Sequence, residues 1–141
     1  MEVLNQKYEN FKKAYEALSK VLEAQEKYKK IAAEDASLFQ MHSAGVIQHF
    51  EMAYETCWKF LKQYLQELKE IDISSPKAIF RACYTNDILP LKITEELSQL
   101  SDARNKTTHI YNQILAQEVS NDIVKHQQVF AEILKLLKLQ K

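Results

Sequence analysis

Glycine and proline are almost missing from this sequence, which holds one glycine and two prolines in 141 residues. Sheet-rich folds need both residue types for their many tight turns. Their scarcity argues against a sandwich or barrel and favours long helices with few connections. A surplus of charge is missing too, because 19 basic and 19 acidic side chains give zero net charge with histidine neutral. This balance disfavours a protein that coats nucleic acid, but it leaves room for a small local phosphate site.

Cysteine occurs only twice, as Cys57 and Cys83, and both lie in apolar stripes. No run approaches the length of a membrane-spanning helix. The N-terminal sequence MEVLNQKYEN is polar and helical in pattern, unlike the apolar core of a signal peptide. We therefore expect a cytoplasmic protein that has no membrane partner and keeps both thiols reduced and mostly buried.

Signatures of cofactor and metal binding are also missing. The chain has no Gly-rich phosphate loop, so we expect it not to bind ATP itself. His42 and His49 lie seven residues apart on one helix face, but no cysteine or third histidine is placed to complete a zinc site with them. We expect no cofactor and no metal.

Apolar residues are plentiful, at 46% of the chain, and they recur at steps of three and four. This spacing is typical of amphipathic helices. It predicts one domain over residues 1–141, with helices over about 3–31, 37–71, 76–87, 93–112 and 119–139. The expected fold is all-α, an antiparallel up-and-down bundle of four main helices plus one short helix. Trp58 and the regularly spaced tyrosines are expected in its core.

The fourth predicted helix breaks its own pattern at Arg104, where an apolar residue should continue the inward stripe. A cation there is costly unless it is paired or lines a cleft. Polar residues then crowd the segment SDARNKTTHIYN, which contains Asn105, His109 and Tyr111. Such violations of the pattern tend to collect at functional sites.

These residue types suit phosphate chemistry. An arginine can fork onto a phosphate, and a histidine can exchange a proton near neutral pH. Arg104 and His109 could together cleave RNA without a metal, with Asn105 in support. On an ideal helix, however, Arg104 and His109 lie about 140° apart, so convergence needs a long reach, a helix end near Asn112 or a second subunit. An interhelical polar cluster or a dimer contact is the plainer interpretation of the same residues.

Three segments resemble one known family. RNKTTHIY fits the R-N-x3-H-x-Y pattern of the HEPN superfamily. FEMAYETCWKFLKQYL resembles the F-E-x3-E-x2-W-K signature of its nucleotidyltransferase substrate-binding branch, and SSPKAIFRACYTNDIL is similar to that branch's S-P-[RK] segment. The order and spacing of the segments match as well, so the resemblance covers nearly the whole chain.

The resemblance implies a two-fold homodimer whose partner is a minimal nucleotidyltransferase, usually encoded beside it. Some relatives are ribonuclease toxins of toxin–antitoxin pairs, in which the arginine and histidine at the positions of Arg104 and His109 cleave RNA. The tyrosine at the position of Tyr111 would be adenylylated by the partner to silence the toxin. The alternative is a non-catalytic subunit that presents substrate to the nucleotidyltransferase.

Further residues have two interpretations each. Glu51, Glu55 and Lys59 match the signature of the branch, although neighbours at this spacing can simply pair on a helix surface. His126 falls on the stripe of the fifth helix, where a satisfied buried or interface histidine is expected.

Overall fold

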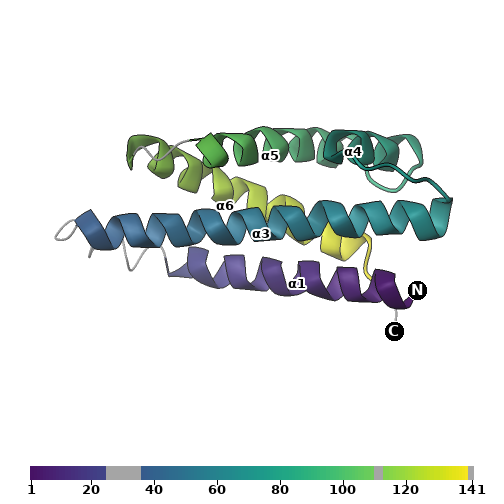
Figure 1. Cartoon of the computed structure of the whole chain (residues 1–141), viewed down its shortest axis with the longest axis horizontal. Helices are drawn as coiled ribbons and strands as arrows, with labels where there is room; N and C mark the ends of the chain where they lie inside the picture. The colour runs from purple at the N-terminus through teal and green to yellow at the C-terminus, as the bar shows by residue number, and fades with distance from the viewer. Residues whose placement is uncertain (25–35, 110–112, 140–141) are drawn as a thin grey trace.

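The computed structural model describes residues 1–24, 36–109 and 113–139, with every side chain in these ranges except those of residues 36, 39, 40, 103 and 106–122. Within these residues there are five helices and no strand. The helices are α1 (Glu2–Glu23), α3 (Ala36–Lys69), α4 (Pro76–Thr85), α5 (Leu91–His109) and α6 (Gln113–Leu136). The four long helices α1, α3, α5 and α6 run in alternating directions along the bundle (Figure 1), which confirms the predicted all-α bundle.

The larger part of the core lies between α1, α3 and α6, which pack on one another. Its centre is aromatic: the Phe11 ring lies 6.1 Å from that of Phe60 and 5.8 Å from that of Phe130. All three phenylalanines are fully buried. Edge-to-face and stacked ring pairs of this kind add to the stabilisation from apolar burial.

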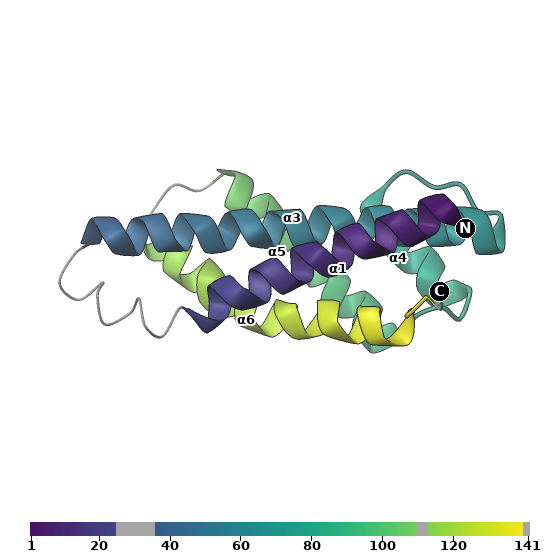
Figure 2. The same ribbon diagram turned by 90° about the horizontal axis from the view of Figure 1, so that it is seen from below.

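The short helix α4 packs on α3 and α5, and α5 also contacts α3 and α6. Figure 2 shows the same bundle from below, with the start of α1 and the end of α6 at the same end of the molecule. Helix α4 begins as predicted, with Ser75 in extended conformation at the N-cap position and Pro76 in the first turn. Proline suits that position because its missing N–H would have had no helical partner.

Several helix boundaries differ from the prediction. Helix α5 begins at Leu91, directly after Pro90, whose carbonyl accepts the Thr94 N–H at 3.2 Å. A proline restricts the residue before it rather than the one after it, so the helix begins earlier than expected. Helix α6 begins six residues before the predicted start, because no glycine or proline interrupts that segment. Helix α1 ends at Glu23, and most of its predicted continuation to residue 31 lies outside the described residues.

Cys57 and Cys83 are both buried and unbridged, as expected. Burial raises the pKa of the Cys57 thiol well above its ordinary range and that of Cys83 to about 12. None of the helices in the described part of the chain has the length and apolar character needed to cross a membrane.

Candidate functional site

Helix α5 changes character halfway along its inward face. Ile93, Leu97 and Leu100 are buried against the core. One turn further, Arg104 continues the same stripe, and its side chain is 37% exposed. The cation therefore lies at the edge of the core, where it lines a cleft.

The cleft lies where α3, the start of α4 and α5 meet, and its volume is about 390 Å³. This volume falls in the range of roughly 300–1,000 Å³ that is typical of small-ligand sites. Nine residues line the cleft: Tyr54, Glu55, Trp58, Ser75, Pro76, Lys77, Ser101, Arg104 and Asn105. Two cations, one carboxylate and two large aromatic side chains thus face one space.

Glu55 connects the aromatic and cationic walls of the cleft. Its Oε1 atom lies 3.6 Å from Nη2 of Arg104, and its Oε2 atom accepts a hydrogen bond of 3.0 Å from Nε1 of Trp58. Glu55 and Trp58 are three residues apart on α3, so one helical turn presents both. The carboxylate keeps the guanidinium at the cleft while both side chains of the pair stay about one-third exposed.

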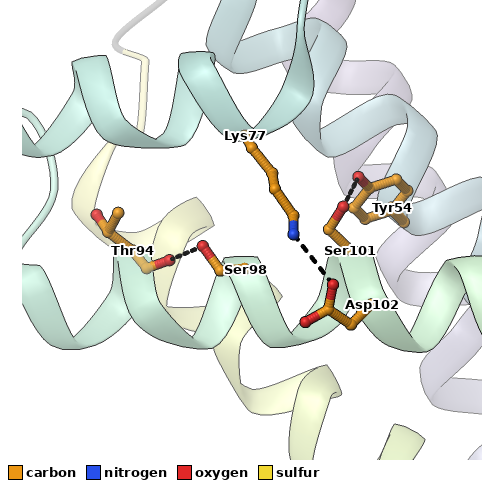
Figure 3. Close-up of polar contacts among 6 residues, drawn as sticks. All are labelled: Tyr54, Lys77, Thr94, Ser98, Ser101 and Asp102. Carbon is orange, nitrogen blue, oxygen red and sulfur yellow. Dashed lines mark hydrogen bonds and ion pairs between the residues drawn. The ribbon is translucent and has the colours of Figure 1, made fainter.

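Lys77 reaches the cleft from the first turn of α4. Its Nζ atom donates to Oδ1 of Asp102 on α5 at 3.1 Å, and both side chains are largely exposed. Figure 3 shows the lysine extending from α4 across the gap to α5. Exposed ion pairs contribute little to stability, so this pair can open for another anion at small cost.

A buried hydrogen bond fixes α5 against α3 beside the cleft. The Tyr54 hydroxyl donates to Oγ of Ser101 at 3.1 Å, and both residues are buried (Figure 3). Burial raises the pKa of the Tyr54 phenol, and the hydrogen bond to Ser101 opposes part of that rise. The phenol therefore stays neutral at physiological pH and serves to hold the two helices in register.

The predicted site residues are only partly described. Arg104 and Asn105 both line the cleft. His109 is the last residue of α5, but its side chain lies outside the described residues, and so does Tyr111 altogether. Helix α5 is continuous through His109. Arg104 and His109 therefore lie about 140° apart around the helix axis, whereas Asn105 and His109 share a face.

Sequence reasoning missed other parts of the cleft. Lys77 was not singled out. Tyr54 is buried, as expected for the regularly spaced tyrosines, but its place at the cleft was not predicted. Trp58 was expected in the core but lies half-buried in the cleft wall. Glu55 pairs with Arg104 across two helices, which favours its interpretation as a site residue over a local surface pair. The sequence did carry one signal for Trp58 and Lys77: the W-K segment and the S-P-K segment occur in the same chain as the arginine motif.

The other histidines lie apart from this cleft. The ring of His126 lies 6.1 Å from that of Phe50, in keeping with a packed position on α6. Burial lowers the pKa of His42. In the part of the chain that the structure describes, no three His, Cys, Asp or Glu side chains gather in a way that could hold a metal ion.

Fold and site together define a helical bundle with a cationic cleft beside an Arg-x4-His segment. The sequence matches the family described as nucleotidyltransferase substrate binding protein like over residues 6–139. The chain belongs to this family, as the resemblance in its three segments implied.

Solved structures share the fold. A Shewanella oneidensis HEPN toxin, tri-AMPylated and in complex with its MNT antitoxin, is 16% identical, with a TM-score of 0.75 and 99% coverage of both chains. A toxin–antitoxin structure with AMP-PNP is 15% identical, with a TM-score of 0.75 and coverage of 98% of this chain and 99% of that one. A Thermus thermophilus protein is 26% identical, with a TM-score of 0.66, over 70% of this chain and 83% of its own. No curated protein matches the sequence.

Proposed function

We propose that this chain is the HEPN component of a two-part system with a minimal nucleotidyltransferase and acts as a metal-independent endoribonuclease toxin. The observation that carries the proposal is the position of Arg104, which opens onto a cleft from the same continuous helix that ends at His109. Membership of the nucleotidyltransferase substrate-binding family supports the choice of partner. The fold, shared over the full length with a toxin held by an MNT antitoxin, supports the pairing of the two roles.

The proposed cleavage needs only a cation and a proton carrier. The 2′-oxygen of one nucleotide attacks the adjacent phosphorus, the bond to the 5′-oxygen of the next nucleotide breaks, and a 2′,3′-cyclic phosphate remains. His109 moves the proton of the 2′-hydroxyl or of the leaving oxygen, while Arg104 offsets the charge that grows on the phosphate. Asn105 shares the helix face of His109 and can orient the same phosphate by hydrogen bonding.

The angle between Arg104 and His109 along α5 favours a composite site in a homodimer. The exposed residues Leu38, Met41 and Met52 lie on one face of α3, at 39%, 71% and 54% exposure. Gly45 shares this face, and among the described residues nothing would lie within 4 Å of a Cβ atom placed on it. Among the described residues, none therefore packs closely on the bare backbone at Gly45, which would let a second copy approach closely. This face adjoins Glu55, one turn further along α3, and so borders the cleft.

Silencing would follow from adenylylation of Tyr111 by the nucleotidyltransferase. Transfer of AMP from ATP forms a phosphodiester on the phenolic oxygen, displaces pyrophosphate and releases the phenolic proton. The modification replaces a neutral phenol by a bulky anion two residues beyond His109. Its charge would compete with substrate phosphate for Arg104, and its volume would obstruct the site, without any change of fold.

A non-catalytic subunit that presents substrate to the nucleotidyltransferase is the second candidate. The description of the family favours it, and the zero net charge of the chain is compatible with it. Expression of the chain alone separates the two. A toxin arrests growth, and His109→Ala relieves the arrest, whereas a presenting subunit leaves growth unchanged.

Mass spectrometry tests the proposed modification. After incubation with the cognate nucleotidyltransferase, ATP and a divalent ion, the peptide that contains Tyr111 should gain one or more AMP groups. Tyr111→Phe should abolish the label. A wild-type chain that stays unlabelled beside an active partner would remove this mode of silencing and favour the presenting subunit.

A further inference from the structure

Two of the side chains that line the cleft are not needed for the proposed cleavage chemistry. Trp58 and Lys77 lie outside the Arg-x4-His segment, on α3 and α4, yet they line the same space as Arg104. Phosphate cleavage requires neither an indole nor a second cation at a distance from the scissile bond. Their presence points to a ligand that extends beyond one phosphate.

The Lys77 side of the cleft has the features of a phosphate site. Lys77 and Pro76 form the first turn of the ten-residue helix α4, and the Ser75 side chain makes no capping hydrogen bond to that turn. The N–H groups and dipole of a helix start add to the charge of a lysine in binding an anion. Lys77 is at present paired with Asp102, whose carboxylate a phosphate oxygen can replace.

The Trp58 side of the cleft has the features of a base site. The indole is half-buried, and its N–H is held by Glu55, so the ring has a fixed orientation. Stacking on such a ring is how proteins bind unpaired bases, since every base has a flat π face. Glu55 adds a carboxylate beside the ring that can accept a hydrogen bond from an amino group of a base.

We infer that this cleft binds one nucleotide of a single-stranded RNA next to the scissile phosphate, with its phosphate on Lys77 and its base on Trp58. The inference rests on the proposed function, because Arg104, which the proposed cleavage places at the scissile phosphate, lines the same cleft as Lys77 and Trp58. Asp102 acts as a competitor for Lys77, and it keeps the cleft close to neutral when no RNA is bound. RNA would thus be recognised in a local pocket, and its binding would not require a basic surface over the whole molecule.

Trp58 provides the readout, because it is the only tryptophan in the chain. The probe is a short 2′-O-methyl oligonucleotide of mixed sequence, which cannot undergo 2′-oxygen attack, labelled at one end for fluorescence anisotropy. The full-length protein should bind it, and the Trp58 emission should be quenched in parallel with the rise in anisotropy. Free AMP should quench far less at the same concentration, because it lacks the neighbouring phosphate.

Variants assign the two halves of the pocket. Lys77→Ala should weaken binding about tenfold and reduce the slope of log affinity against log salt by about 0.7, the value for one phosphate contact on a single strand. Asp102→Asn should tighten binding. Lys92→Ala is the matched control, an exposed lysine on α5 about 18 Å along the helix from Arg104, and it should change neither quantity.

Trp58→Leu keeps apolar packing and should weaken binding about tenfold, whereas Trp58→Phe keeps a ring and should restore most of it. If the oligonucleotide binds while Lys77→Ala, Trp58→Leu and the Trp58 emission show no effect, the pocket is wrong and the proposed function stands. If the oligonucleotide does not bind at all, the proposed ribonuclease function fails. Quenching by AMP without oligonucleotide binding overturns the assignment to an RNA strand.

Discussion

Arg104 interrupts an apolar stripe, and its partners explain how the fold tolerates it. The guanidinium stays partly in solvent and has a carboxylate at 3.6 Å, so it avoids the large desolvation cost of a buried ion. Glu55 in turn is fixed by the indole of Trp58. The three side chains form a polar edge on an otherwise apolar bundle, and this edge is where a phosphate can meet a cation.

The two thiols make stability depend on pH in the alkaline range. Burial raises the pKa of Cys83 from 9.0 to about 12 and raises that of Cys57 as well. A pKa that is higher in the folded state contributes stability that is complete below the unfolded value and is lost as pH rises toward the folded value. The free energy of unfolding should therefore fall from about pH 9 to about pH 12, as measured by denaturant unfolding.

The double variant Cys57→Ala, Cys83→Ala should flatten much of that fall. A remaining slope is expected, because burial also raises the pKa of Tyr8 and Tyr54. A double variant with the same alkaline profile as the wild type would show that the thiols do not govern it.

At the site, single residues were predictable where they broke a pattern. Arg104 stood out because a cation interrupted an apolar stripe, and Asn105 followed from the motif beside it. Lys77 could not be found this way, since a lysine in the first turn of an amphipathic helix breaks no rule. Trp58 was misplaced because helical spacing tells which face a residue occupies but not where neighbouring helices leave a gap.

At the scale of elements, the C-terminal end of helix α3 has an unusual backbone conformation. Helix α3 ends in a left-handed turn: Glu70 has a φ angle of 56°, and the Ile71 N–H donates to the Leu65 carbonyl at 3.1 Å. This bond satisfies one of the last carbonyls of the helix. Glycine is the usual residue at such a position, because any Cβ atom is strained there.

Glu70→Gly should raise the free energy of unfolding by up to about 1 kcal/mol, because it removes this strain. Lys69→Gly is the matched control one residue earlier, inside the helix, and it should lower stability by about 0.5–1 kcal/mol. Thermal unfolding of the two variants against wild type measures both effects. Two losses of similar size would contradict the left-handed turn.

The order of the elements could be predicted from the sequence because periodic apolar residues mark the interior of each helix. Boundaries were less accurate where the signal was ambiguous. Pro90 marks a break, but it can stand just before a helix as well as after one, and α5 begins directly after it. Asn112, a favoured N-cap residue type, directly precedes α6 in the sequence, but it was taken as the end of the preceding helix, so the prediction began at the clearer part of the stripe.

For the whole molecule, the exposed face of α3 predicts self-association. Light scattering at micromolar concentration should give about twice the mass of one chain, because two-fold pairing through one patch is the commonest form of oligomer. Met52→Lys places a charge within the proposed interface and should yield monomers. Leu136→Lys is the control, since Leu136 on α6 is exposed to nearly the same degree, 55% against 54%.

A monomeric wild-type chain would remove the composite site. Arg104 and His109 would then have to converge within one chain despite the angle between them on α5. A dimer that both variants leave intact would instead place the interface elsewhere on the bundle.

The most direct test of the ribonuclease assignment is cleavage of RNA by the purified chain without its partner. The proposed metal-independent mechanism should give products with 2′,3′-cyclic phosphate ends, no inhibition by EDTA, and losses of about 10²–10³-fold for Arg104→Ala and for His109→Ala. Activity that survives both substitutions, or that disappears with EDTA, would contradict it.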